Sequence, residues 1–224
     1  MMSSGLRRRV RLVLGRDPET EIVAAHDAAP PARVSQIEFV AYAEDCVLSG
    51  FIALAEDRLT DLLNAHEEYE LVDVYAEDLA TGTASRVDRI VVQRDELMMV
   101  HATGPRGDRG RRQHTRQHPL ALQVGPYHVR GYLHALPGTD PVSSFAHRRP
   151  MVPLTEAWVE YRQGEAQQRQ RVSTLVVNRH LADWVAAAHE TEVEMPELYV
   201  PAARGPLFKD FTAYVLDGPS PRNG

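Results

Sequence analysis

The sequence predicts a mainly β protein: a tandem duplication of a small barrel-like or strongly bent antiparallel sheet module, each copy with at most a short helical turn. The main observation is a nine-residue match, Arg86–Arg94 with Arg171–Arg179, in which five positions are identical. Two shorter matches precede it, and the offset between copies rises from 81 to 83 to 85 residues. Loops absorb insertions while paired strands keep register, so a rising offset is typical of diverged copies. The shorter matches pair Val47–Ile52 with His128–Leu133, and Leu71–Tyr75 with Leu154–Trp158.

Each copy is expected to hold four or five short strands. Side chains alternate along a strand, so Leu48, Gly50 and Ile52 share one face, which we expect to be the core face. Between the second and third strands, Arg58–Asn64 has the composition of one or two helical turns. The strands expected in the first copy are Ile37–Ala43, Cys46–Leu54, Tyr69–Ala76, Val87–Val92 and Leu97–His101.

The chain divides into five segments by composition. The two modules are expected at residues 37–101 and 119–187. The segment between them is rich in Gly and Arg, which is typical of a flexible linker. The remaining segments are a basic N-terminal segment with an extended arm (1–36), that linker (102–118) and a C-terminal tail (188–224).

Charge is distributed unevenly along the chain. The net charge is −6, but residues 37–100 carry four Arg against fifteen acids, a net charge of −11. Residues 119–187 carry seven Arg against five acids, a net charge of +2, and residues 101–118 carry +4. An acidic module beside basic segments predicts contact between the halves or two different partners.

Cysteine usage and hydropathy favour a cytoplasmic protein. The single cysteine, Cys46, cannot form an intramolecular disulfide, which fits a reducing compartment. No apolar run approaches the ~20 residues of a spanning helix, so we expect no membrane span.

An aromatic side chain occupies the same outward position in both predicted modules. Phe51 and Tyr132 each follow the glycine of the second strand, on the face opposite the expected core. Outward aromatic side chains either cover a sheet or form a contact surface, between the copies or with a partner. We therefore include both residues among the candidate binding residues.

One stretch of the first copy resembles a known group of domains. Gly50, then Arg58–Asn64, then Leu71–Asp73 and Ile90–Val92 resemble a family of uncharacterised bacterial domains that share a glycine and an Arg-Leu-Ser/Thr-Asp-x-Leu-Asn motif. The resemblance covers most of the first copy and only the strands of the second copy. It implies a fold and no assigned activity.

The same order of motifs is also distantly similar to the Sm-like fold. In Sm-like proteins an Asn of the first motif and an Arg of the second hold an RNA base. The resemblance then nominates Asn64 and Arg94 in the first copy and Arg179 in the second, where Phe145 falls near the position of Asn64.

Motifs that would identify an enzyme are not found in the sequence. There is no Gly-rich phosphate loop, no nucleophile elbow and no zinc-ligand spacing. The pair His114 and His118 has a metal-binding spacing but lies in the Arg-rich segment without a nearby carboxylate. Accordingly we nominate no catalytic residue, metal site or cofactor.

The sequence thus favours a non-enzymatic protein-interaction or scaffold module, with another protein or a second copy of the chain as partner. The alternative is RNA binding through the Arg-rich arms, with Arg109, Arg111 and Arg112 gripping phosphates, and through the Sm-like turn. The acidic first module disfavours a polyanionic partner. An enzyme of unknown type is the third hypothesis.

Overall fold

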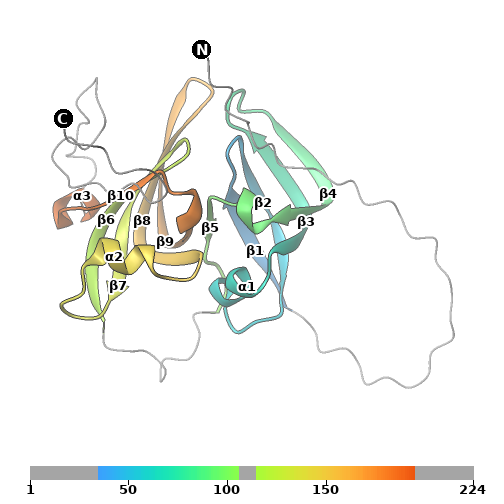
Figure 1. Cartoon of the computed structure of the whole chain (residues 1–224). Helices are drawn as coiled ribbons and strands as arrows, with labels where there is room; N and C mark the ends of the chain where they lie inside the picture. The colour runs from blue at the N-terminus through green and yellow to red at the C-terminus, as the bar shows by residue number, and fades with distance from the viewer. Residues whose placement is uncertain (1–34, 106–114, 195–224) are drawn as a thin grey trace, which may run out of the picture.

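The computed structural model describes residues 35–105 and 115–194. Within these residues, ten strands form one antiparallel sheet in the order β10-β6-β7-β8-β9-β5-β1-β2-β3-β4 (Figure 1). The prediction of a mainly β protein is confirmed. The strands of both predicted modules belong to this one sheet, whose two edges are β4 and β10. In the described part of the chain, no helix is long and apolar enough to cross a membrane.

The first half, residues 35–105, supplies the strands coloured blue to green in Figure 1. Its sheet order is β5-β1-β2-β3-β4. Its elements are β1 (Ser35–Tyr42), β2 (Cys46–Leu54), α1 (Leu59–Ala65), β3 (Glu68–Asp78), β4 (Ala84–Gln93), the 3-10 turn η1 (Arg94–Glu96) and β5 (Met99–His101).

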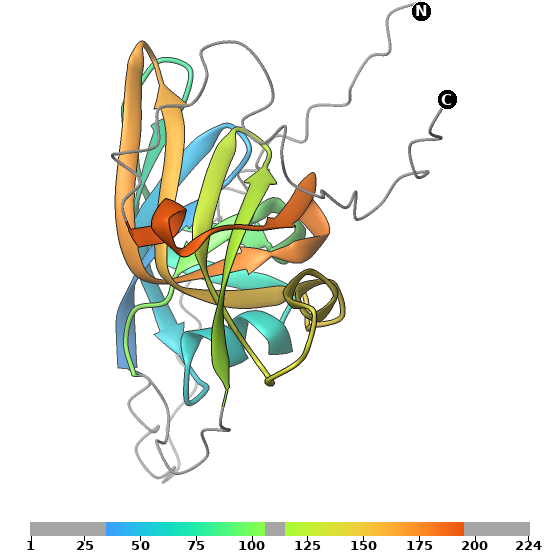
Figure 2. The same cartoon turned by 90° about the vertical axis from the view of Figure 1, so that its left-hand side faces the viewer.

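The second half, residues 115–194, runs through the same succession of elements and faces the viewer in Figure 2. Its sheet order, β10-β6-β7-β8-β9, repeats that of the first half. Its first strand begins at Arg116, so the expected linker range 102–118 overlaps it. The elements are β6 (Arg116–Val124), β7 (Tyr127–Ala135), α2 (Pro141–Ala146), β8 (Met151–Gln163), β9 (Ala166–Asn178), η3 (Arg179–Leu181), β10 (Trp184–Ala187) and a short additional helix, α3 (Glu190–Glu194).

The halves are joined by pairing between β5 of the first half and β9 of the second. Val100 lies opposite Val176, and the ladder continues where the amide of Ala102 donates to the carbonyl of Thr174. At its other end the amide of Asn178 donates to the carbonyl of Met98. Because backbone groups in a sheet interior must be paired, this ladder makes two five-stranded sheets into one.

Each half contributes buried side chains to the hydrophobic core of the other half across this joint. Val176 and Met151 belong to the second half but pack in the core of the first. Tyr42 and Met99 belong to the first half and pack in the core of the second. All four side chains are nearly fully buried, so separating the halves would expose apolar surface from both cores.

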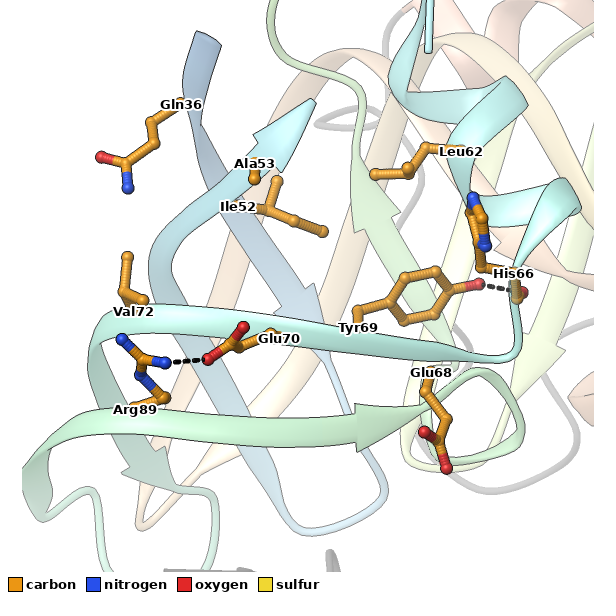
Figure 3. A pocket seen from close by; sticks show the side chains of 10 residues that line it. All are labelled: Gln36, Ile52, Ala53, Leu62, His66, Glu68, Tyr69, Glu70, Val72 and Arg89. Atoms are coloured by element: carbon orange, nitrogen blue, oxygen red, sulfur yellow. Dashed lines mark hydrogen bonds and ion pairs between the residues drawn. The ribbon is translucent and has the colours of Figure 1, made fainter. Parts of the chain in front are cut away.

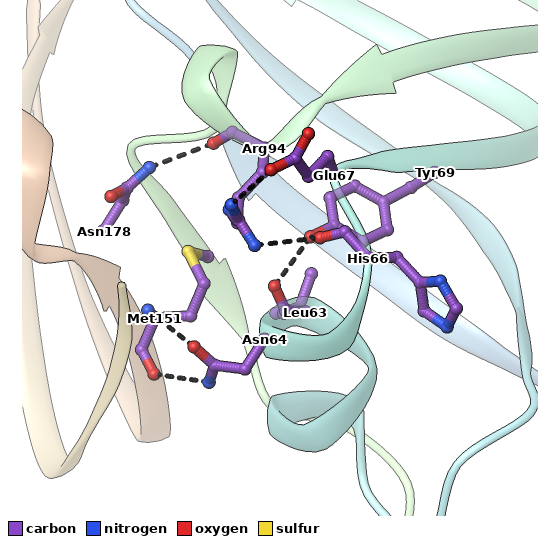
Figure 4. Close-up of polar contacts among 8 residues, drawn as sticks. All are labelled: Leu63, Asn64, His66, Glu67, Tyr69, Arg94, Met151 and Asn178. Atoms are coloured by element: carbon purple, nitrogen blue, oxygen red, sulfur yellow. Dashed lines mark hydrogen bonds and ion pairs between the residues drawn. The ribbon is translucent and has the colours of Figure 1, made fainter. Parts of the chain in front are cut away.

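A side-chain amide closes the joint at its α1 end (Figure 4). Pairing between β7 and β8 stops at Thr155, which leaves the backbone of Met151 without a β7 partner. Asn64 replaces that partner: its Nδ2 donates to the Met151 carbonyl at 2.9 Å, and its Oδ1 accepts the Met151 amide at 3.1 Å. The same Nδ2 also donates to the carbonyl of Thr60.

Aromatic side chains fill the joint on the side that faces the core of the second half. The ring of Tyr42 lies 5.2 Å from that of Tyr127 and 5.8 Å from that of Tyr161, both in edge-to-face geometry. The hydroxyl of Tyr42 is 2.9 Å from His101 Nε2 and donates to Gln170 Oε1 at 3.0 Å. This cluster therefore ties β1 and β5 to the second half through packing and hydrogen bonds.

Replacing Asn64 by Ala should lower the free energy of unfolding by about 1–3 kcal/mol, because the buried backbone of Met151 loses its partners. Chemical denaturation measures the change. Thr60→Ala is the control, because it keeps the carbonyl that Asn64 contacts. Equal stability of the two variants would contradict this account of the joint.

Acid should weaken the joint through His101. Burial lowers the pKa of His101 to about 4, from 6.5. His101 therefore stays neutral in the folded state at pH values at which it is protonated in the unfolded chain. Above pH 6.5 it does not lower the free energy of unfolding. As the pH drops from 6.5 toward 4, the free energy of unfolding falls by up to about 1.4 kcal/mol per pH unit. Melting temperatures measured across this range should fall less steeply for His101→Gln, and parallel curves would contradict the assignment.

Candidate functional site

A bulge interrupts the pairing of the second and third strands in each half. The register shifts between Ser49 and Phe51 in the first half and between Arg130 and Tyr132 in the second. The glycine at each shift lets the strands approach closely: a Cβ on Gly50 would lie 2.9 Å from the carbonyl oxygen of Val72. This explains why a glycine stands at that position of the strand.

Each bulge holds an acidic residue in the left-handed backbone region. Asp73 has a φ of 50° and Glu156 a φ of 49°. Such values are uncommon for residues other than glycine. The two residues occupy matching positions, so the bulge has the same backbone geometry in both halves.

Each acid belongs to a triad with an arginine and an aromatic side chain. In the first half Arg86 pairs with Asp73 at 3.1 Å and lies over the ring of Tyr75, 5.9 Å from its centroid. In the second half the corresponding set is Glu156, Arg171 and Trp158, with an ion pair of 2.7 Å and a cation–π distance of 6.0 Å. The aromatic and the arginine lie opposite each other in register in both halves.

The face that bears the triad is covered in the second half. Helix α3 packs against β7 and β8, and the indole Nε1 of Trp158 donates to the carbonyl of Val193 at 3.0 Å. Tyr132 is 8% exposed there, and burial together with the carboxylates of Glu194 and Glu190 raises its pKa. The outward position expected for Tyr132 is thus a buried one, because a helix from beyond the predicted module lies over it.

The same face of the first half is open. Phe51, which corresponds to Tyr132, is 40% exposed, and Tyr75, which corresponds to Trp158, is 52% exposed. Val72 lies opposite Phe51 in register and is partly buried. We call Phe51, Val72, Tyr75 and Arg86 the aromatic face.

A groove of about 370 Å³ adjoins the aromatic face and shares Val72 with it (Figure 3). Apolar side chains from β2, α1 and β3 form part of its wall. Its polar lining includes Glu70, which pairs with Arg89, and the exposed Glu68. The other side chains that line the groove are Gln36, Ile52, Ala53, Leu62, His66 and Tyr69.

The candidate residues Asn64 and Arg94 both lie near the C-terminal end of α1 (Figure 4). The amide of Asn64 is engaged with Thr60 and Met151, as described above. The guanidinium of Arg94 donates to the carbonyl of His66 at 3.1 Å and pairs with Glu67 at 3.2 Å. These groups serve contacts within the chain.

Other candidate residues lie elsewhere. Arg179 donates from Nε to the carbonyl of Arg148 at 2.6 Å, on the second half. The three linker arginines, Arg109, Arg111 and Arg112, lie outside the described residues.

Two side chains that can act as nucleophiles have raised pKa values. Burial, with help from Asp45, raises the pKa of the Cys46 thiol to about 12, so the nucleophilic thiolate is scarce at neutral pH. Burial raises the pKa of Tyr69 to about 12 as well, although it lies in the groove. Within residues 35–105 and 115–194, no cluster of three or more His, Cys, Asp or Glu side chains could hold a metal ion.

The triads were not among the residues nominated from sequence. The signal was present in the matched segments Leu71–Tyr75 and Leu154–Trp158, which both place an acid two residues before an aromatic. Both partner arginines open the longer match, at Arg86 and Arg171. A search for polar residues shared by the matched segments would have found both triads.

Comparisons of the chain with protein-family models, with curated proteins and with solved structures find no match.

Replacing Asp73 should separate backbone strain from the ion pair. Asp73→Gly relieves the φ of 50°, whereas Asp73→Ala keeps the strained conformation, and both remove the carboxylate. We expect the Ala variant to be less stable than the Gly variant by about 1 kcal/mol, measured by chemical denaturation. Equal stabilities would mean that the bulge backbone relaxes when the ion pair is lost.

Proposed function

We propose that this chain is a non-enzymatic protein-interaction module whose aromatic face binds a segment of another protein. The observation that carries the proposal is the contrast between the halves. One face is covered by α3 over Tyr132 and Trp158, while Phe51 and Tyr75 at corresponding positions are exposed. Exposed aromatic side chains beside a groove are typical of protein contact surfaces.

The second half suggests how such a segment would bind. There, five residues of helix bury the side chain of Val193 against the sheet and accept a hydrogen bond from Trp158. A partner segment of similar size, with one apolar side chain, would fit over Phe51 and Val72. The hydroxyl of Tyr75 would take the donor role of the Trp158 indole.

Charge favours a partner segment with basic residues. Residues 37–100 carry a net charge of −11. Both arginines near the face are already paired, Arg86 with Asp73 and Arg89 with Glu70. Complementary charge would speed association and make it sensitive to salt.

We further propose that the halves are diverged copies of one small, strongly bent β module. Support comes from the repeated succession of elements, the repeated strand order and the two triads at corresponding register positions. In this view α3 is an addition that closed the face in one copy and left it open in the other.

Photocrosslinking tests the interaction. With p-benzoylphenylalanine in place of Tyr75, crosslinking in the native host should yield a discrete protein adduct, because the side chain lies on the proposed contact surface. The same group in place of Leu136, which is 56% exposed on the second half, is the control. Phe51→Ser should remove the adduct at position 75 without lowering the melting temperature.

Three outcomes would contradict the proposal. Adducts of equal yield at positions 75 and 136 would indicate random collision. Failure of Phe51→Ser to reduce the adduct would place the contact elsewhere. A nuclease-sensitive adduct would favour the nucleic-acid alternative.

A further inference from the structure

We infer that the chain assembles head to tail with further copies of itself, with β4 of one copy pairing antiparallel with β10 of the next. The inference uses the edges of the sheet and does not depend on the aromatic face. The partner it names is a second copy of this chain.

The internal joint is the template. It pairs the fifth strand of one half, β5, with the fourth strand of the other, β9. The corresponding strands are β10 and β4, and in the described residues β10 pairs only with β6 and β4 only with β3. Within residues 35–105 and 115–194, each chain therefore has one fourth strand, β4, and one fifth strand, β10, at an edge of the sheet.

The correspondence fixes the register of the proposed ladder. Val100 lies opposite Val176 in the internal joint. The two fifth strands, β5 and β10, are offset by 85 residues in the sequence, and so are the two fourth strands, β4 and β9. Val185 therefore corresponds to Val100 and Val91 to Val176, so Val185 would lie opposite Val91. By the same rule Ala187 would lie opposite Arg89, as Ala102 lies opposite Thr174.

The backbone groups at these positions point in the required direction. Along an antiparallel strand, successive residues direct their N–H and C=O groups to opposite neighbours. Ala188 donates to Pro119 on β6, so Val185 and Ala187 direct theirs away from β6. Arg94 donates to Glu67 at the end of β3, so Val91 and Arg89 direct theirs away from β3.

Side chains and charge also fit a second copy. Val91 is partly exposed on an apolar strand end, whereas its counterpart Val176 is buried by the internal joint. The contact would place the first half, with its net charge of −11, against the second half of a neighbour, residues 115–194, whose eight arginines and eight acids cancel. Pairing β4 with β4 would instead bring two strongly acidic halves together.

The proposed joint would be weaker than the internal one. Glu68 stands where the second half places the buried Met151, so no apolar side chain enters the neighbour's core at that position. Helix α2 (Pro141–Ala146) carries no side-chain amide that could take the role of Asn64. Assembly should therefore depend on concentration. Head-to-tail contacts of this kind close into rings or extend as filaments.

Disulfide trapping between two chains tests the register. Both chains carry Cys46→Ser, one with Arg89→Cys and the other with Ala187→Cys; both positions are exposed. After mixing and mild oxidation, we expect a disulfide-linked heterodimer, because directly opposite residues lie within disulfide range. In the control, Ser85→Cys replaces Arg89→Cys: it is exposed on the same strand but about 13 Å away along it. Equal yields from the two mixtures would overturn the inference.

Light scattering after size exclusion tests the assembly itself. The 25.1 kDa chain should elute at a multiple of its mass, and dilution should reduce that mass. Val91→Pro should give the monomer, because it removes the outward N–H without a bond to β3, whereas Val91→Thr should assemble. A wild-type mass of one chain at all concentrations, or assembly that persists in Val91→Pro, would overturn the inference. Tyr75→Ser should assemble normally, which separates this result from the proposed interaction at the aromatic face.

Discussion

The ladder between β5 and β9 is the interaction on which the rest of the structure depends. β5 has only three residues, Met99–His101, and in the described chain it is held by β1 on one side and β9 on the other. Each core is completed across this ladder, by Met151 and Val176 in one direction and by Tyr42 and Met99 in the other. Hydrophobic burial stabilises the arrangement, and the directional groups, Asn64 and the Tyr42 hydroxyl, select it over a shifted pairing.

The two halves share the triad framework but present different surfaces. Exposed ion pairs contribute little net stability, so Asp73 and Glu156 are better understood as residues that occupy a left-handed bulge position and fix an arginine over an aromatic ring. The framework is shared, and the difference lies in what covers it. A single short helix, α3, converts an exposed aromatic position into a buried one.

Much of the fold could be predicted from sequence because the information is local. Alternating side chains marked the strands, and the matched segments marked which strands correspond. Three features depend on distant contacts that no local pattern encodes. The partner of Asn64 is the backbone of Met151, 87 residues away. Tyr132 is buried by a helix that lies beyond the predicted module. The edges of the sheet are β4 and β10 because the fifth strand of the first half, β5, pairs with the fourth strand of the second half, β9.

Covalent linkage allows the two halves to differ strongly in charge. Within one chain the effective concentration of β5 near β9 is high, so the internal joint does not require charge complementarity to form. Asn64 on one side and Met151 on the other strengthen this joint, whereas α2 carries no side-chain amide and Glu68 stands at the position that corresponds to Met151. Once the joint is secured in this way, one half can carry a net charge of −11 while the charges of the other cancel. Two copies of the first half then repel each other more strongly than a first half and a second half do, which is a physical reason for a direction in any assembly the chain forms.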